Sequence, residues 1–183
     1  LYTAALSFQS LGAFTHVTRN YLENSLSTNA GLRLDMHNIN LNSLLRISPR
    51  ASAQYHLNEA WALQSNLGWY NQLPPAILML ANEANNWTTE GTGPGSVAQA
   101  ATGIEFQNGE TYRFSLEAYY KYYSSMPYLW DDEQSFSQAI GAYVAVGDQT
   151  SSADAEGRSY GLELFLQQKL KGTYWWTLSY NYG

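Results

Sequence analysis

Residues 111–123 alternate between apolar and polar side chains without a break. Even positions are aromatic or aliphatic, whereas Arg113, Glu117 and Lys121 stand at odd positions. A period of two places successive side chains on opposite faces of a β-strand. Strands of globular proteins are commonly about five or six residues long, but a strand that crosses a bilayer at a tilt needs about 9 to 11. The segment therefore predicts a membrane-spanning strand with one apolar and one polar face.

The same alternation recurs along the rest of the chain. It is clear in residues 47–57, 60–71 and 157–170, weaker in 24–36, 97–107 and 174–182, and weakest within 5–18. We predict an all-β chain of about eight antiparallel strands that form a segment of a larger transmembrane β-barrel. The chain starts without Met and ends inside an alternating pattern, so we expect both ends to continue.

Composition supports strands over membrane helices and excludes several other classes of protein. Charged residues make up 13% of the chain and aromatic residues 15%, yet no apolar run approaches the roughly 18 residues of a spanning helix. The net charge is −6 with nine Lys and Arg, which argues against a nucleic-acid partner. Cysteine is absent, so disulfides and thiolate chemistry are excluded.

The predicted connections differ in length at the two ends of the strands. Short turns are expected near residues 19–23, 58–59, 108–110 and 171–172, and long polar loops at 37–46, 73–96 and 124–156. Outer-membrane barrels have short periplasmic turns and longer extracellular loops. The pattern therefore predicts that the three long loops lie on the outside.

Charged side chains fall on the polar sides of these strands. A charge that faced lipid at mid-membrane would cost roughly 2 to 4 kcal/mol, so we expect these residues to face the barrel lumen. They either contact a plug or form a hydrated, mutually paired wall, and Arg33 and Arg50 are the strongest candidates because guanidinium groups bind oxygen ligands bidentately. The lumen candidates are Arg33, Asp35, Arg50, Glu105, Arg113, Glu117, Lys121 and Glu163.

Aromatic residues lie near the edges of the apolar sides. A ring with a polar edge suits the headgroup zone of a bilayer, so these residues are candidates for aromatic girdles. The girdle candidates are Trp61, Trp69, Tyr112, Tyr122, Tyr160, Tyr174, Trp176 and Tyr182. Trp87, Tyr128 and Trp130 fall in the long outer loops and are candidates either for stacking on a ligand or for folding a loop onto the rim of the barrel.

The sequence contains no metal-ligand spacing and no nucleophile motif, although a catalytic pair of carboxylates would have the same pattern as the charges of a lumen wall. His16, His37 and His56 have no second ligand at metal spacing, and no Gly-x-Ser-x-Gly elbow occurs. We therefore expect no catalytic residues, no metal and no cofactor.

Several short segments resemble the barrel domain of TonB-dependent outer-membrane receptors, especially Bacteroidetes-type members. They follow one another in the family's order over nearly the whole chain. They are residues 30–35 (AGLRLD), 47–50 (ISPR), 68–75 (GWYNQLPP), 103–107 (GIEFQ), 116–123 (LEAYYKYY) and 161–166 (GLELFL).

The resemblance implies a bacterial outer-membrane receptor with a 22-stranded barrel that is closed by an N-terminal plug domain. Such a receptor imports scarce ligands, such as metal chelates, vitamins or glycans, with energy that TonB delivers through the N-terminal part. The expected partners are membrane lipid, the remaining strands, the plug, TonB and a surface lipoprotein. The alternatives are a complete eight-stranded barrel with a structural, adhesive or enzymatic role, and a soluble β-sandwich, which the strand lengths disfavour.

Overall fold

The chain forms a single β-sheet. The computed structural model describes residues 8–39, 42–73, 94–109, 111–129, 134–135, 151–171 and 174–183. Within these ranges, no helix has the length and apolar character needed to cross a membrane. The strands are β1 (Phe8–Tyr21), β2 (Leu26–Ile39), β3 (Asn42–His56), β4 (Trp61–Gln72), β5 (Gly95–Asn108), β6 (Tyr112–Leu129), β7 (Gln134–Ser135), β8 (Ser151–Lys171) and β9 (Tyr174–Tyr182).

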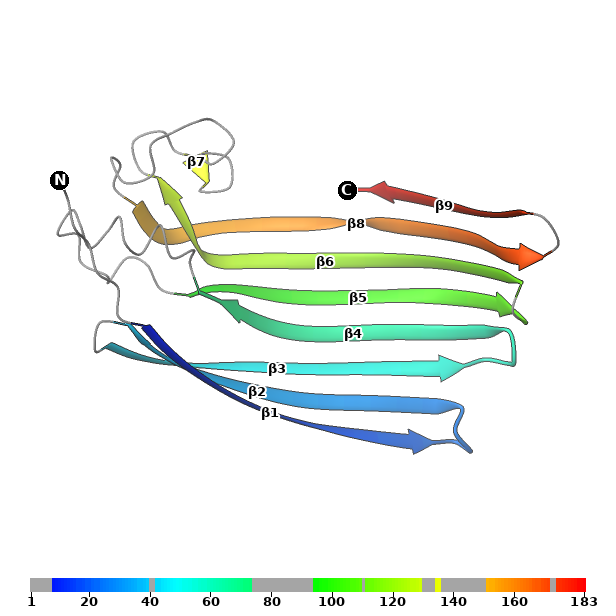
Figure 1. Cartoon of the computed structure of the whole chain (residues 1–183), viewed down its shortest axis with the longest axis horizontal. Helices are drawn as coiled ribbons and strands as arrows, with labels where there is room; N and C mark the ends of the chain where they lie inside the picture. Colours follow the sequence, from blue (N-terminus) through cyan, green and yellow to red (C-terminus); the bar gives the residue numbers. More distant parts are fainter. Residues whose placement is uncertain are drawn as a thin grey trace.

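The strands pair in sequence order and are antiparallel throughout (Figure 1). The order across the sheet is β1-β2-β3-β4-β5-β6-β8-β9, and the two-residue β7 pairs with β6 beside this path. Each of the eight predicted segments coincides with a strand, which confirms the predicted fold class. β1 and β9 lie at opposite edges of the sheet (Figure 1).

The predicted loop at 37–46 is wrong. β2 continues to Ile39 and β3 starts at Asn42, and these two residues are opposite each other in the ladder. The polar, Asn-rich sequence suggested a loop, but strand propensity is weak compared with continued backbone pairing to a neighbour. The connection between β2 and β3 is therefore tight, although it lies at the same end of the sheet as the two long connections (Figure 1).

The predicted loop at 124–156 is also too long, because β6 runs to Leu129 and β8 begins at Ser151. The pairing of β6 with β8 shifts register between Tyr123 and Met126, and Ser125 has a φ of 56°. A bulge of this kind adds a residue and bends the strand, which reverses the alternation of side chains. The predicted strand stopped at this point because the period of two is lost there.

The connections at the other end are short, as expected. β1 and β2 are joined by residues 22–25, slightly later than the expected turn, and β8 and β9 by residues 172–173. In the turn between β3 and β4, the Asn58 side-chain oxygen accepts hydrogen bonds from the backbone N–H groups of Ala60 (2.9 Å) and Trp61 (3.0 Å). This is an Asx-type turn, which satisfies donors that the ladder leaves free.

The sheet has almost no core of its own. Among the described residues, the buried hydrophobic side chains are Ala62 and Ala101, whereas Leu67 is 61% exposed and Tyr160 is 67% exposed. A single β-layer with a large exposed apolar surface needs a second layer, a lipid phase or a partner to cover it. The chain therefore has the form of a single-layered wall, one of whose faces needs a covering layer.

Removal of the Asn58 side chain should destabilise the β3–β4 turn. We expect Asn58→Ala to lower the free energy of unfolding by about 1 kcal/mol, because two backbone donors lose their acceptor. Urea unfolding of the purified protein measures this change. Glu59→Ala in the same turn is the matched control, and an equal loss in both variants would contradict the role of Asn58.

Candidate functional site: the two faces of the sheet

The register of the ladders gives the sheet a polar face. Arg50 lies opposite Gly68, Gly68 opposite Gln99, and Gln99 opposite Lys121, so these residues form one row across β3 to β6. Opposed residues of an antiparallel pair share a face. Their face, which we call the polar face, holds all eight lumen candidates. That the eight lumen candidates face a barrel lumen or a plug stays a prediction.

The opposite face, which we call the apolar face, holds all eight girdle candidates. Trp61 lies opposite Phe106 with ring centroids 4.8 Å apart, and Trp69 lies opposite Ala98. At about 3.3 Å per residue and a tilt near 40°, the distance along β4 from Trp61 to Trp69 corresponds to a rise of roughly 20 Å. That rise is close to the apolar band of a barrel, which is about 25 Å tall. The headgroup role of these aromatic residues stays a prediction.

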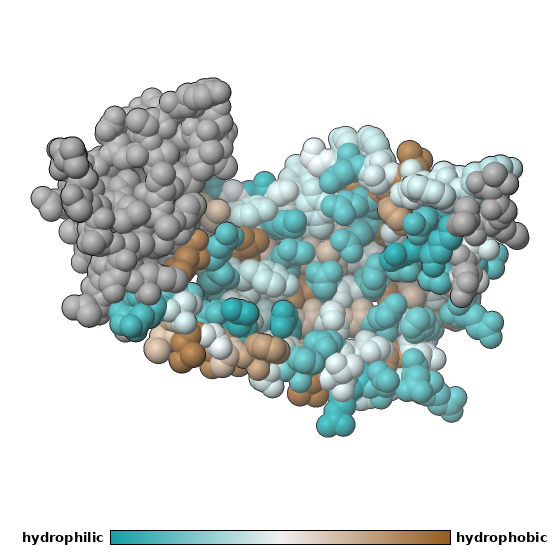
Figure 2. All heavy atoms as spheres, viewed as in Figure 1, coloured by the Kyte–Doolittle hydropathy of each residue, from teal (hydrophilic) through white to brown (hydrophobic). Residues whose placement is uncertain are grey.

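Hydrophilic residues spread across the side of the sheet that faces the viewer in Figure 2, with smaller apolar groups between them. On the apolar face, large apolar side chains are exposed in seven strands, namely β1, β2, β3, β4, β6, β8 and β9. Examples are Leu11, Leu34, Ile47, Leu63, Leu116, Leu162 and Leu178. An apolar surface of this extent, backed by a charged polar face, is the pattern of a barrel wall between lipid and water.

Arg33 and Asp35 form the best-defined ion pair of the polar face. Arg33 Nε lies 2.7 Å from Asp35 Oδ2, and Nη2 lies 2.8 Å from Oδ1, so the pair is bidentate. Both residues belong to β2 and point to the same side because they are two residues apart. A Cβ atom on the facing Gly12 would come within 2.8 Å of Asp35 Oδ1, so the glycine leaves room for the pair.

Arg46 was missed by the sequence analysis. Its ladder partner is Asp35, which places it on the polar face beside the Arg33–Asp35 pair. Its Nε atom is buried and has no hydrogen-bond partner among the described residues. The signal was available, since Arg46 has the same parity as Ser48 and Arg50 of the predicted strand 47–57, but Arg46 fell at the end of the predicted loop 37–46.

A second group of charges lies on β5, β6 and β8. Arg113 binds Glu105 at 3.1 Å from its Nε atom, and its guanidinium lies 5.8 Å from the centroid of the Phe165 ring. Glu117 and Glu163 are directly opposite each other. In the described part of the chain, the ion pairs are Arg33–Asp35 and Arg113–Glu105, so neither of these two glutamates forms an ion pair there, although Asn181 Nδ2 donates a hydrogen bond to Glu163 Oε1 (3.5 Å).

The ligand-stacking candidates are not placed by the structure. Trp87 and Trp130 lie outside the described residues, and the side chain of Tyr128 does as well, although its backbone belongs to β6. Within the described residues, no group of three or more His, Cys, Asp or Glu side chains is suited to a metal ion.

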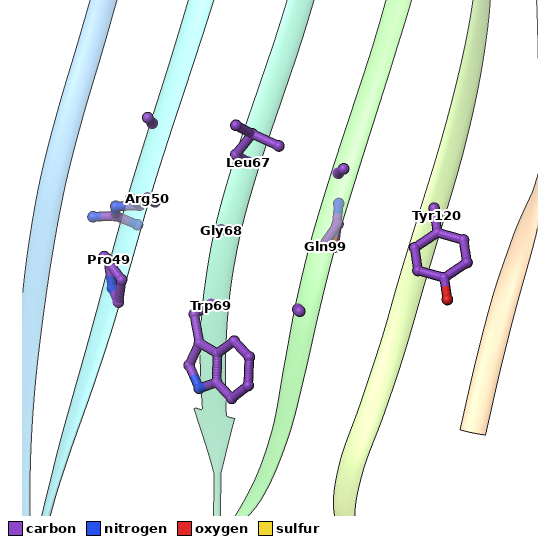
Figure 3. Close-up of a pocket in the computed structure, with 10 residues that line it drawn as sticks. Pro49, Arg50, Leu67, Gly68, Trp69, Gln99 and Tyr120 are labelled. Atoms are coloured by element: carbon purple, nitrogen blue, oxygen red, sulfur yellow. The ribbon is translucent and has the colours of Figure 1, made fainter. Parts of the chain in front are cut away.

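The apolar face has a shallow hollow between β3 and β6. Figure 3 shows the rings of Trp69 on β4 and Tyr120 on β6, with β5 between them. Ala98 and Ala100 of β5 line the floor because their side chains are small. The hollow thus belongs to the surface on which the girdle candidates lie.

The family profile described as "TonB dependent receptor-like, beta-barrel" matches residues 1–183, which is the entire chain. The chain belongs to this family. The resemblance seen in the sequence is thereby confirmed at the level of the TonB-dependent receptor barrel. No curated protein matches this barrel chain by sequence.

Solved structures show the same barrel wall. The FrpB iron transporter from Neisseria meningitidis is similar with a TM-score of 0.66 and 11% identity, over 93% of this chain and 25% of its own. The copper transporter OprC has a TM-score of 0.67 and 16% identity, over 96% and 29%. The ferric preacinetobactin receptor BauA from Acinetobacter baumannii has a TM-score of 0.61 and 17% identity, over 97% and 25%. At these identities the likeness concerns the fold, and the chain spans only 25 to 29% of the length of these solved chains.

The two faces of this barrel wall should respond differently to a new charge. Leu116 on the apolar face lies between Ile104 and Leu164, whereas Ser115 on the polar face lies next to Glu105. We expect Leu116→Arg to lower the free energy of unfolding by about 2 to 4 kcal/mol in lipid vesicles, because lipid does not solvate the charge. Ser115→Arg, one residue away, should be nearly neutral. Equal effects of the two substitutions would contradict the assignment of the faces.

Proposed function

We propose that this chain is part of the barrel domain of a bacterial outer-membrane receptor for TonB-dependent uptake of a scarce ligand, such as a metal chelate, a vitamin or a glycan. The observation that carries the proposal is the division of the sheet into an apolar face and a charged polar face, together with its two unpaired edges. The family to which the chain belongs consists of receptors and transporters, and a transport role needs no catalytic residue.

The edges of the sheet favour a larger barrel over a complete eight-stranded one. A small closed barrel would pair β1 with β9, but these strands lie at opposite ends of the strand order. Unpaired backbone N–H and C=O groups inside lipid cost several kcal/mol each, so an open sheet does not persist there. Additional strands on both sides of this sheet would satisfy these groups. We therefore propose that the residues 1–183 form one section of a single transmembrane domain.

The charges of the polar face support a plug domain as a partner. Glu117 and Glu163 oppose each other without a cation, and like charges at opposed positions of a ladder are destabilising. Basic side chains of a plug inside the lumen would offset this repulsion. TonB would act on such a plug, and lipid would cover the apolar face.

Finer assignments remain predictions. They are membership of the Bacteroidetes-type subgroup, contact with a surface lipoprotein, and stacking of a ligand on Trp87, Tyr128 or Trp130.

Uptake by cells tests the proposed transport. We expect cells that express the complete receptor to accumulate one member of a panel of labelled ferric siderophores, cobalamin and oligosaccharides. Accumulation should stop when TonB is deleted or when a protonophore removes the proton gradient, because import against a gradient needs energy from the inner membrane. Accumulation that persists under both conditions would instead indicate a passive pore. A mature protein no longer than this chain would support the small-barrel alternative.

The opposed glutamates provide a test of the plug contact. If plug cations bind Glu117 and Glu163, the double variant Glu117→Gln, Glu163→Gln should release the plug at a lower urea concentration, since it loses two ionic contacts. Limited proteolysis of the plug in the complete receptor measures this release. Gln167→Ala on the same face is the control. A double variant that holds its plug more tightly than the wild type would show that the repulsion is not offset by a plug.

A further inference from the structure

The polar face of β2 and β3 carries more positive charge than the side chains around it neutralise. Arg33, Arg46 and Arg50 lie on this surface with a single carboxylate, that of Asp35. Asp35 binds Arg33, so within the described residues Arg46 and Arg50 have no carboxylate partner. The chain as a whole has a net charge of −6, which makes a local surplus of cations unusual for it. We call Arg33, Arg46 and Arg50 the arginine cluster.

The ladder brings the three arginine residues to neighbouring positions of one face. Arg33 lies opposite Ser48, and Arg46 and Arg50 are the residues two positions before and after Ser48. Such diagonal neighbours have Cα atoms about 7 to 8 Å apart, within reach of long side chains. Figure 3 shows the side chain of Arg50 extending from β3 toward β2. The backbone positions of the three arginine residues therefore share one region of the polar face.

Small residues keep this region open. Gly31 lies opposite Arg50, and a Cβ atom there would meet Arg50 Nε at 3.1 Å. Gly12 lies opposite Asp35, and a Cβ atom there would approach Arg33 Nη2 at 3.3 Å as well as the carboxylate. At these distances a Cβ atom would push the neighbouring guanidinium group by a few tenths of an ångström, and at Gly12 it would also clash with Asp35 Oδ1. The two glycines thus leave space beside the arginine side chains.

The cluster retains donors for an incoming group. Arg33 uses Nε and Nη2 on Asp35, and its side chain is still 52% exposed, so Nη1 is available. Arg46 has a buried Nε atom with no partner among the described residues, which is costly unless an acceptor arrives. A guanidinium group offers donors in a planar fork that matches the oxygen atoms of carboxylate and phosphate groups.

We propose that the arginine cluster binds an anionic group, carboxylate or phosphate, of the imported ligand. This inference rests on the proposed transport function and adds the charge of the ligand to it. Arg33 and Arg50 lie near the middle of β2 and β3, and Arg46 lies closer to the end of the two strands where Ile39 pairs with Asn42. By the rule for outer-membrane barrels that end faces outward, so a ligand from outside would meet Arg46 first and reach the other two arginines within the lumen.

Anion binding to the complete receptor in detergent at low ionic strength tests this proposal. Citrate and pyrophosphate serve as carboxylate and phosphate probes, glucose as an uncharged control, and titration calorimetry as the readout. We expect at least one of the two anions to bind and glucose not to. Arg46→Gln and Arg50→Gln should each weaken binding about tenfold or more, because each removes a charge-assisted hydrogen bond. Arg50→Lys should fall between wild type and Arg50→Gln, since it keeps the charge but loses the fork.

Two further variants show why Arg33 is not used in the test and whether a loss of affinity is specific to the arginine cluster. Arg33→Gln would leave the part-buried Asp35 without its partner and is expected to fold poorly, so Arg46 and Arg50 carry the test. Lys169→Gln removes one positive charge near the turn end of β8 and should leave the affinity unchanged. Failure of both anions to bind, or an equal loss in Lys169→Gln, overturns the proposal.

Two further outcomes are informative. One shows whether the arginine cluster binds a ligand or a plug residue, and the other shows whether the anion site or the transport proposal has failed. If the arginine variants release the plug faster under proteolysis while citrate and pyrophosphate affinities stay the same, the cluster holds an acidic plug residue, and the proposal is wrong. Anion binding needs no energised membrane. Arginine-dependent binding without TonB-dependent uptake would therefore reject transport alone, whereas uptake of an uncharged ligand without anion binding would reject the anion site alone.

Discussion

The antiparallel ladder is the interaction on which the other features of this chain depend. Each strand of the main path donates and accepts backbone hydrogen bonds with its neighbours, from β1 through β9. Lipid offers no hydrogen-bond partners, so a spanning sheet must pair every backbone group with another strand. Because the ladder holds neighbouring strands in one register, it also decides which side chains share a face. The separation of charges from apolar side chains follows from this pairing and from the period of two.

Alternation in the sequence was sufficient to predict where the eight main strands lie and on which face of the sheet the eight lumen and eight girdle candidates fall. It failed where the residue types suggest a loop, or where the alternation ends, although the backbone continues to pair with a neighbouring strand. The residues around Asn38 look like a loop by composition, but the neighbouring strands extend the ladder through them. At Ser125 a bulge changes the parity, and the periodic signal ends although the strand does not.

The contacts within the polar face were beyond a reading of the sequence alone. The parity of Arg33 and Asp35 predicts a shared face, yet the bidentate geometry depends on rotamers and on the space above Gly12. The position of Arg46 opposite Asp35 depends on the register between β2 and β3. Register describes how two strands are aligned, so the alternation of side chains within one strand does not predict it.

The tight connection between β2 and β3 also bears on how the chain acquires its structure. Ile39 and Asn42 meet after two intervening residues, whereas Gln72 and Gly95 are separated by residues 73–94. The entropy lost on closing a loop grows with the logarithm of its length, which makes the second closure more costly by about 2 kcal/mol. β1 to β4 are therefore joined by connections that cost little entropy to close, whereas the pairing of β4 with β5 carries a larger cost. The arginine cluster lies within β2 and β3, so its geometry depends on pairings that are local in the sequence.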